Sequence, residues 1–226
     1  KARTEALAAW LDTAAPDVAV LQELKSVDEA VPRELFTDRG YAVETHGQKG
    51  FNGVAILSKH GLSDITRGLG GDDADTHARL IEATVQPEDA APVRVVGLYL
   101  PNGNPAPGPK FDYKLAWMAR LEARVAELLA EERALVVAGD YNVIPQAEDA
   151  ASPDAWRDDA LFRPESRTAF RRLLHLGLTD ALRAVHPHMP PGRGRRDFTF
   201  WDYQRGAWER DDGIRIDHLL LSPQAA

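Results

Sequence analysis

The sequence predicts a single-domain α/β protein in which buried strands are covered by amphipathic helices. Residues 135–138 form a short apolar run, Leu-Val-Val-Ala, that Gly139 ends, which indicates a core strand buried on both faces. Residues 111–132 carry apolar side chains at every third or fourth position, which predicts a long helix lying on a sheet. The 226 residues, 44% of them apolar, suffice for one domain with a sizeable core, including a two-layer sheet architecture that runs long as a single unit.

Helical and strand patterns alternate along the first hundred residues. Leu7 and Leu11 predict a helix over residues 3–14, and Pro16 stops it. Residues 17–23 predict a buried strand that ends in a carboxylate, and residues 27–38 are helical in pattern. Strands at 41–46 and 53–58 are expected to pair through a turn at 47–50, with further strands at 64–68, 79–85 and 93–100.

The second half begins with the helix at 111–132 and the strand at 135–138. An acidic stretch interrupted by prolines then predicts irregular structure to about residue 165. Helices are expected at 165–176 and 178–185, an aromatic strand at 198–203 and a final strand at 214–221. We find no internal repeat and no linker that would divide residues 1–226, so we expect one domain.

Charge and composition restrict the classes of function. The net charge of −8 argues against affinity that rests on a broad basic surface, although residues 192–196 form a local basic loop. With no cysteine, disulfides, thiolate zinc sites and cysteine nucleophiles are excluded. No apolar run approaches membrane length and no leader opens the chain, so we expect a cytoplasmic protein without a membrane partner.

The carboxyl end of the strand at 135–138 carries the first candidate site. Asp140 and Asn142 follow Gly139 and stand two residues apart. On an extended segment, side chains at this spacing point the same way, so a carboxylate acceptor and an amide donor can converge on one small group. This combination suits phosphoryl chemistry. The structural alternative is an Asx-turn that caps the strand.

Three more polar residues stand near the ends of predicted strands: Glu23, Tyr99 and Asp217. With the pair at 140 and 142 they could line one edge of packed sheets, as active sites on sheet scaffolds do. The alternatives are an exposed carboxylate for Glu23, a core tyrosine for Tyr99, and a partner of Arg215 for Asp217. Oxygen ligands without cysteine or paired histidine suit Mg²⁺ or Mn²⁺ rather than zinc.

Six short blocks occur in an order that is found in one family of nucleases. They are Leu21-Gln-Glu-Leu-Lys25, Gly47-Gln-Lys-Gly-Phe-Asn-Gly53, Tyr99-Leu-Pro-Asn-Gly103, Gly139-Asp-Tyr-Asn142, Phe198-Thr-Phe-Trp-Asp-Tyr203 and Arg215-Ile-Asp217. A lone Gly-Asp-x-Asn is a weak signal, but six ordered blocks are specific. Over essentially its whole length the chain resembles the exodeoxyribonuclease III and abasic-site endonuclease family of the exonuclease–endonuclease–phosphatase superfamily.

This resemblance implies a four-layer α/β sandwich, in which two packed sheets are flanked by helices. It also implies Mg²⁺-dependent or Mn²⁺-dependent hydrolysis of phosphodiesters in double-stranded DNA. The expected reactions are release of nucleotides from 3′ ends and incision beside abasic sites, and we expect the enzyme to act as a monomer.

The resemblance gives roles to individual residues through the motifs. Glu23 resembles the metal ligand, with Asp140 and Asn142 also at the metal. Asp140 resembles the residue that deprotonates or orients the attacking water, and Asn142 resembles the donor to the phosphate. Tyr99 resembles a phenol that contacts the phosphate, and Asp217 a carboxylate that orients a catalytic histidine. The substrate-binding residues would be Phe200, Ile214 and Ile216, around an extruded abasic sugar, and Asn102 and Lys110, at the DNA backbone.

Two blocks of the family are not found within residues 1–226. The family begins with a strand carrying a Trp-Asn pair and ends with Ser-Asp-His, and we expect these upstream of Lys1 and downstream of Ala226. Two alternatives to a DNA nuclease are open: a superfamily relative acting on phospholipid or inositol phosphates, and a DNA-binding relative without turnover. The aromatic block and Arg215-Ile-Asp217 favour the nuclease.

Overall fold

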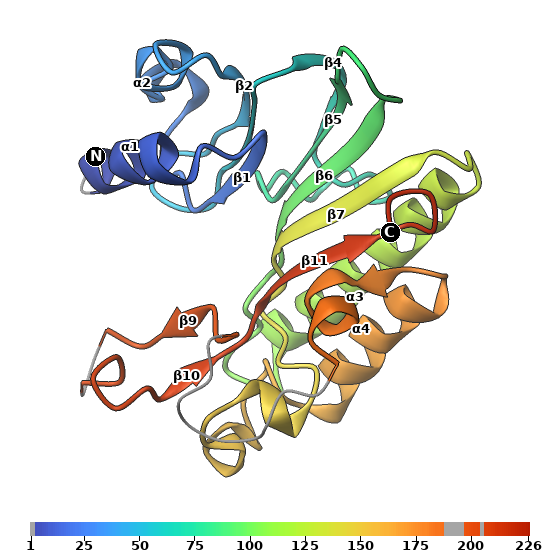
Figure 1. The fold of residues 1–226 in the computed structure, drawn as a ribbon. Coiled ribbons are helices and arrows are strands. Elements are labelled where there is room, and N and C mark those ends of the chain that lie inside the picture. The colour runs from blue at the N-terminus through green and yellow to red at the C-terminus, as the bar shows by residue number, and fades with distance from the viewer. Residues whose placement is uncertain (1–2, 188–196, 204–205) are drawn as a thin grey trace. The chain divides into compact units, whose positions relative to one another are not determined.

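The computed structural model describes residues 3–187, 197–203 and 206–226, which form two compact units, residues 1–99 and 100–226 (Figure 1). The basic loop at 192–196 lies outside the described residues. Among the described helices, none is long and apolar enough to cross a membrane. Each unit has its own strands and helices.

The first unit contains two antiparallel sets of strands. In one, β3 lies between β1 and β2, and Ile56 of β3 faces Val20 on one side and Glu44 on the other. In the other, β5 lies between β4 and β6. The two sets approach closely at Gly97, where an added Cβ would lie 2.8 Å from Val20 Cγ1. The strands are β1 (Val18–Gln22), β2 (Ala42–His46), β3 (Val54–Ser58), β4 (Gly61–Arg67), β5 (Leu80–Gln86) and β6 (Val93–Tyr99).

Helices cover the outer face of the sheet formed by β1, β3 and β2. Leu11 of α1 (Thr4–Ala14) and Phe36 of α2 (Glu34–Thr37) are buried in one cluster with Leu57 of β3. β3 is buried along its whole length because this cluster lies on one face and β5 on the other. Burial of each such apolar side chain stabilises the fold by roughly 1.5–3 kcal/mol. The cluster therefore holds β1, and with it the start of the loop that follows, in a fixed position.

The second unit is built around β11, which pairs antiparallel with β7 and β8. In this register Asp217, the first residue of β11, faces Asp140, the last residue of β7. A smaller pair of strands, β9 and β10, precedes β11. The strands are β7 (Ala134–Asp140), β8 (Thr179–Asp180), β9 (Phe200–Trp201), β10 (Gly213–Ile214) and β11 (Asp217–Leu221).

Two long helices, α3 (Pro109–Leu129) and α4 (Pro164–His175), pack on each other and on this sheet (Figure 1). Phe170 of α4 contacts the rings of Tyr141 and His218, with centroid distances of 5.6 and 4.7 Å. The buried face of α3 follows the predicted apolar spacing, with one lysine in it. Shorter elements are η1 (Asp28–Ala30) in the first unit, and η2 (Ala147–Asp149), η3 (Pro153–Trp156) and α5 (Ala181–Val185) in the second.

The prediction of one helix over residues 27–38 is wrong. The structure has only η1 and the single turn of α2 there, separated by Pro32. Proline has no N–H to donate and disfavours the helical conformation of the residue before it, and Val31 is extended, with φ −72° and ψ 128°. The helical pattern of these residues was therefore outweighed by the conformational restriction that Pro32 imposes.

The final strand predicted at 214–221 is divided in two. β10 ends at Ile214 and β11 begins at Asp217, because the backbone N–H of Arg215 donates to Asp149 O at 2.8 Å instead of joining the ladder. The aromatic strand predicted at 198–203 is only β9, and the segment at 178–185 begins as β8 before α5. β7 is longer than predicted, and it alternates between buried and half-buried residues instead of being buried on both faces.

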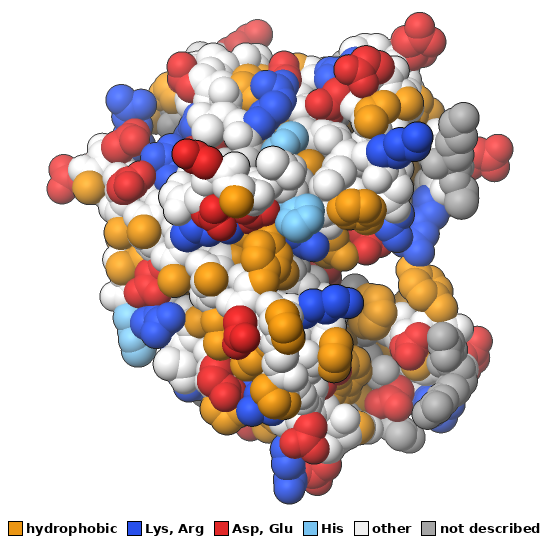
Figure 2. Space-filling model, turned by 180° about the vertical axis from the view of Figure 1, so that it is seen from behind, with side chains coloured by type: hydrophobic (Ala, Val, Ile, Leu, Met, Phe, Trp, Pro, Cys, Tyr) orange, Lys and Arg blue, Asp and Glu red, His pale blue; other side chains and the backbone are white. Residues whose placement is uncertain are grey.

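The other predicted helices and strands are present, and the α/β class is confirmed. On the face shown in Figure 2, Lys and Arg side chains are interspersed with Asp and Glu among the described residues. No continuous field of one sign covers this face, which agrees with the moderate negative charge of the sequence.

Candidate active site

Asp140 and Asn142 meet at the end of β7, but not through an extended backbone. Asn142 has a φ of 47°, in the left-handed region, so the geometric reason given for their convergence was wrong. The backbone N–H of Asn142 donates to Asp140 Oδ1 at 2.7 Å, and its Nδ2 donates to Asp140 Oδ2 at 3.3 Å. The first bond is an Asx-turn. The turn that was considered as an alternative is therefore the device that brings the carboxylate and the amide together.

A third predicted residue, Asn102, continues this set of hydrogen bonds. Its Nδ2 donates to Asn142 Oδ1 at 3.3 Å, while Asn142 Nδ2 also donates to Leu100 O at 2.8 Å. Asn142 is only 5% exposed, whereas Asn102 is exposed. The Asp140 carboxylate is thus hydrogen-bonded to the Asn142 side chain, which is itself fixed by bonds to Asn102 and Leu100. These bonds restrict the rotamers of Asp140 and Asn142.

Lys114 on α3 underlies these loops and was missed by the sequence analysis. Its side chain is fully buried, and Nζ donates to Asn142 O at 2.6 Å and to Asn102 O at 3.1 Å. Burial lowers the pKa of Lys114 to about 7, although the charges of Asp140 and Asp159 act in the opposite direction. The available signal was its position: Lys114 follows Phe111 by three residues, on the apolar stripe of the helix.

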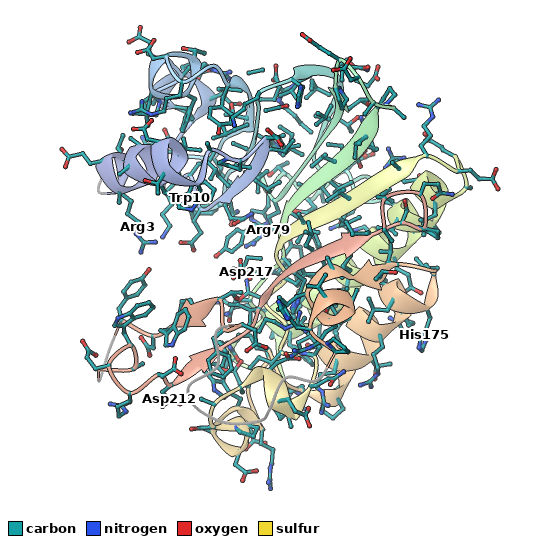
Figure 3. All side chains as sticks on the ribbon, viewed as in Figure 1. Arg3, Trp10, Arg79, His175, Asp212 and Asp217 are labelled. Carbon is teal, nitrogen blue, oxygen red and sulfur yellow. The ribbon has the colours of Figure 1, made fainter. Side chains whose placement is uncertain are left out.

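Asp217 lies beside Asp140 in the sheet, at the beginning of β11 (Figure 3). Facing residues in an antiparallel pair have Cβ atoms roughly 4.5–5.5 Å apart, so these two carboxylates share one environment. Burial raises the pKa of Asp217, while a hydrogen bond with the Thr199 side chain acts in the opposite direction. Thr199 Oγ1 also accepts the backbone N–H of Asp217 at 3.1 Å.

The alternative that Asp217 serves as the partner of Arg215 is wrong. Arg215 is buried, and its guanidinium donates to Asp149 Oδ1 at 2.8 Å and to Asp180 Oδ2 at 2.9 Å. Arg183 also binds Asp149, and it pairs with Asp197 at 3.2 Å. This buried ion-pair network anchors the segment between β10 and β11. This network could not be predicted from local sequence patterns, because its members are up to 66 residues apart.

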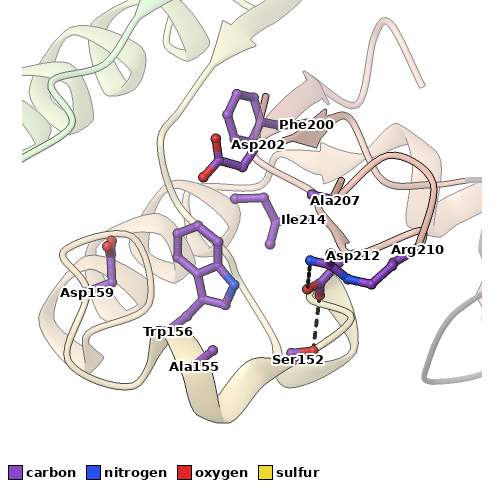
Figure 4. A pocket seen from close by; sticks show the side chains of 10 residues that line it. All are labelled: Ser152, Ala155, Trp156, Asp159, Phe200, Asp202, Ala207, Arg210, Asp212 and Ile214. Carbon is purple, nitrogen blue, oxygen red and sulfur yellow. Dashed lines mark hydrogen bonds and ion pairs between the residues drawn. The ribbon is translucent and has the colours of Figure 1, made fainter. Parts of the chain in front are cut away.

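A pocket of about 250 Å³ lies where β9 and β10 approach η3 (Figure 4). Phe200 and Ile214, two of the three residues predicted for a sugar pocket, line it together with Trp156. Ile216 is instead buried in the adjoining core cluster with Ile214. The pocket is less apolar than predicted, since charged side chains also line it: Asp159, Asp202, Arg210 and Asp212.

In the first unit, Glu23 and Tyr99 are brought together. The Tyr99 hydroxyl donates to Glu23 Oε1 at 2.7 Å, and Lys25 Nζ lies 3.1 Å from Glu23 Oε2. Burial raises the pKa of Glu23, but the hydrogen bonds from Tyr99 and Lys25 outweigh it, so the pKa lies below its usual range. The side chains of Glu23 and Lys25 are 48% and 54% exposed. Glu23 is therefore an ionised, accessible carboxylate.

Arg79, labelled in Figure 3, supports Tyr99 and was also missed. Its guanidinium lies 5.0 Å from the centroid of the Tyr99 ring, and its Nη1 donates to Tyr99 O at 3.1 Å. A cation over an aromatic face is attracted by the negative face of the ring. Lys110, predicted to touch DNA, is exposed on the first turn of α3, and its role stays a prediction.

Comparison with known proteins identifies the family of the chain. The pattern of the Endonuclease/Exonuclease/phosphatase family matches residues 1–226. The chain is 34% identical to exodeoxyribonuclease III of Haemophilus influenzae, over all of this chain and 85% of that protein. The 3′ phosphatase NExo from Neisseria, solved with a product DNA hairpin, matches with a TM-score of 0.90 and 36% identity, over 99% of this chain and 82% of that one. An AP endonuclease from Archaeoglobus fulgidus matches with a TM-score of 0.88 and 34% identity, over 98% and 82% of the two chains. The chain therefore belongs to the endonuclease/exonuclease/phosphatase family.

Proposed function

We propose that this protein is a metal-dependent DNA repair nuclease that removes nucleotides from 3′ ends and incises DNA beside abasic sites. The observation that carries the proposal is the Asx-turn at the end of β7, where Asn142 holds the Asp140 carboxylate through two N–H groups. Relatives named exodeoxyribonuclease III and AP endonuclease, at 34% identity each, support the same reaction class.

We assign to Asp140 the role of orienting and deprotonating the attacking water. Because its two oxygens already accept N–H groups of Asn142, the carboxylate is fixed in orientation before any substrate binds. A carboxylate oxygen has two lone pairs, so accepting one N–H group does not prevent it from accepting a hydrogen bond from a water molecule. Asp140 would accept a proton from this water as it attacks the phosphorus, with the water oxygen forming the new P–O bond and the sugar oxygen leaving.

Asn142 and Asp217, which lie next to that carboxylate, are assigned supporting roles. By the family motif, Asn142 is assigned as a hydrogen-bond donor to the phosphate and also as a residue at the metal. Asp217, with its raised pKa, is assigned the orientation of a catalytic histidine. Pre-oriented donors near developing negative charge are typically the largest single contribution to phosphoryl and acyl transfer.

The residues of the first unit fit a hard divalent cation. Glu23 is ionised and accessible, and its Oε2 already faces one cation, the Lys25 ammonium. The described residues include no group of three or more His, Cys, Asp or Glu that could hold a metal. Mg²⁺ is commonly bound by one or two carboxylates with water and substrate phosphate completing its shell, so we assign Glu23 to Mg²⁺ or Mn²⁺. When bound, the ion would neutralise phosphate charge and act as a Lewis acid.

Tyr99, Asn102 and Lys110 are assigned to the DNA itself. The Tyr99 phenol is a donor at a strand end and would contact a phosphate, while the exposed Asn102 and Lys110 would contact the backbone. Phe200 and Ile214, with Ile216 behind them, would receive an extruded abasic sugar. We further propose that the enzyme is a cytoplasmic monomer acting on double-stranded DNA.

The test compares substrates. With Mg²⁺ or Mn²⁺ present, we expect incision of a duplex carrying one abasic site and trimming of its 3′ ends. Neither an inositol phosphate nor a phospholipid should be hydrolysed. Hydrolysis of the phosphoinositide alone would favour the other branch of the superfamily. Tight binding of the duplex without any cutting in either metal would favour a DNA-binding relative without turnover.

A further inference from the structure

Lys114 is an unusual residue for the interior of a protein. Its side chain is fully buried on the face of α3 that also carries Phe111 and Trp117. Lysine is rarely buried to this extent, because an ammonium loses its hydration there. A methionine or leucine would fill the same space at no electrostatic cost. The position therefore calls for an explanation in terms of what its amine contacts.

The amine joins two loops that are distant in sequence. Nζ donates to the carbonyl of Asn142, after β7, and to the carbonyl of Asn102, after β6, at 2.6 and 3.1 Å. The loop at 101–104 leaves space for this side chain only because residue 103 is glycine. Gly103 has a φ of +91°, and a Cβ there would lie 2.7 Å from Lys114 Cδ. The loop and the lysine thus fit each other closely.

Both carbonyls belong to residues whose side chains act on Asp140. Asn142 holds the Asp140 carboxylate directly, and Asn102 donates to Asn142 Oδ1. We propose that Lys114 is a positioning residue, which fixes the backbone of Asn102 and Asn142 and thereby sets the orientation of the Asp140 carboxylate. The proposal rests on the proposed function of Asp140.

The chemistry of the amine suits this task. A lysine amine carries three donors when charged and two when neutral. Two carbonyls accept its hydrogen bonds among the described residues, so both bonds persist in either protonation state. Burial, which lowers the pKa of Lys114, therefore leaves the two contacts intact. No apolar side chain could satisfy the two carbonyls.

The test is Lys114→Met, which keeps the volume and removes the donors. Amide hydrogen exchange should rise about tenfold at the N–H groups of Asn142 and Asn104, with the interior of α3 changing by less than about twofold. Those two amides report on the loops because they donate to Asp140 Oδ1 and Asn102 Oδ1. For incision of an abasic-site duplex, kcat should fall about 10²-fold, as expected for a misplaced catalytic group, while KM changes little.

Lys59→Met is the matched control. Lys59 also donates to a backbone carbonyl, that of Ala15, but it belongs to the first unit, whereas both loops belong to the second. It should leave exchange at Asn142 and kcat unchanged. In Lys114→Ala, added n-propylamine should restore part of kcat, because the small amine can occupy the vacated space and donate to the same carbonyls.

Three results would overturn the inference: unchanged exchange at Asn142 in Lys114→Met, faster exchange throughout α3 and β7, or a kcat close to that of the parent. The second would indicate a general structural role, which a lower midpoint of urea unfolding would also report. If the parent protein does not cut the duplex, the proposed function fails. The exchange measurement still decides whether Lys114 holds the loops.

Discussion

Glu23 and Asp140 are both carboxylates at the ends of strands, yet their surroundings differ in every respect that the structure describes. Glu23 is 48% exposed, and its partners are a phenol and the ammonium of the equally exposed Lys25. The partner of Asp140 is Asn142, which is 5% exposed and rests on a fully buried lysine. Exposed ion pairs contribute about 0–1 kcal/mol, so the partners of Glu23 can be exchanged easily. Buried polar networks are costly to rearrange.

The difference matches the two tasks proposed for these residues. A ligand for an ion that arrives and departs needs a carboxylate whose current cation can be displaced. A group that must accept a proton at one moment of a reaction needs a fixed orientation beforehand. Substitutions of Asp140 and Glu23 test this division directly, and substitutions of His218 and Phe200 test neighbouring parts of the second unit.

Asp140→Asn should lower kcat for incision by about 10²–10⁴-fold, since the amide keeps the shape but cannot accept a proton. Duplex binding measured without divalent metal should be nearly unchanged. The control is Asp154→Asn, because Asp154 forms an exposed pair with Arg157 and should be silent. A rate within a few-fold of the parent would remove Asp140 from the chemistry.

His218 should make the second unit sensitive to acid. Burial, together with the charge of Arg215, lowers its pKa from 6.5 to about 4, and its Nε2 bonds to Val143 O at 2.9 Å. As the pH falls, His218 is therefore protonated in the unfolded chain before it is protonated in the folded protein. The stability that comes from a neutral His218 is complete above pH 6.5 and is lost between 6.5 and 4, on the order of 3 kcal/mol in all.

The measurement is urea unfolding of the parent protein and His218→Gln between pH 5 and 7.5. The parent should lose stability towards pH 5, and the variant should show a flatter profile because glutamine does not titrate. Parallel profiles would mean that other groups carry the acid sensitivity.

Glu23→Gln should raise the Mg²⁺ concentration for half-maximal rate by about tenfold, because the site has few carboxylates to spare. The glutamine oxygen can still accept from Tyr99, so the loop should keep its shape. Glu29→Gln, at an exposed position nearby in sequence, is the control. A metal titration that superimposes on that of the parent would leave Glu23 as an exposed structural carboxylate.

Phe200→Ala should have the smallest effect, a loss of a few-fold in abasic-site incision that exceeds the loss in trimming of an intact 3′ end. Phe200 contributes one wall of a pocket that Trp156 and Ile214 also line, so the pocket would be widened but not removed. A loss of less than tenfold corresponds to less than about 1.4 kcal/mol of transition-state stabilisation. Equal losses in the two assays would assign Phe200 to packing.

Local patterns were sufficient for much of this fold. The apolar run at 135–138 correctly indicated a strand, although β7 extends to Asp140, and the spacing along α3 correctly placed its buried face. The family followed from six ordered blocks. These features depend on residues close together in sequence, which is why they can be recognised without a structure.

Contacts between distant residues could not be recognised in the same way. Lys114 binds carbonyls 12 and 28 residues away, and the Asp149 that replaces Asp217 as the partner of Arg215 is 66 residues away. Backbone conformation was a second source of error. The left-handed Asn142 and the break at Pro32 both overrode patterns read from side chains alone.

Thr199 links the two ends of the segment that carries β9 and β10, and these linked ends are called the base of the segment. Its backbone N–H donates to Ile214 O, and its side-chain oxygen accepts from the N–H groups of Ile216 and Asp217, all within 3.1 Å. The buried Arg215 fixes the same base from the other side. Because neither anchor lies in the loop that joins β9 to β10, we expect substitutions in that loop to leave Asp217 in place. Under the proposed function, the residues that line the pocket could then change in evolution while the position of Asp217 is kept.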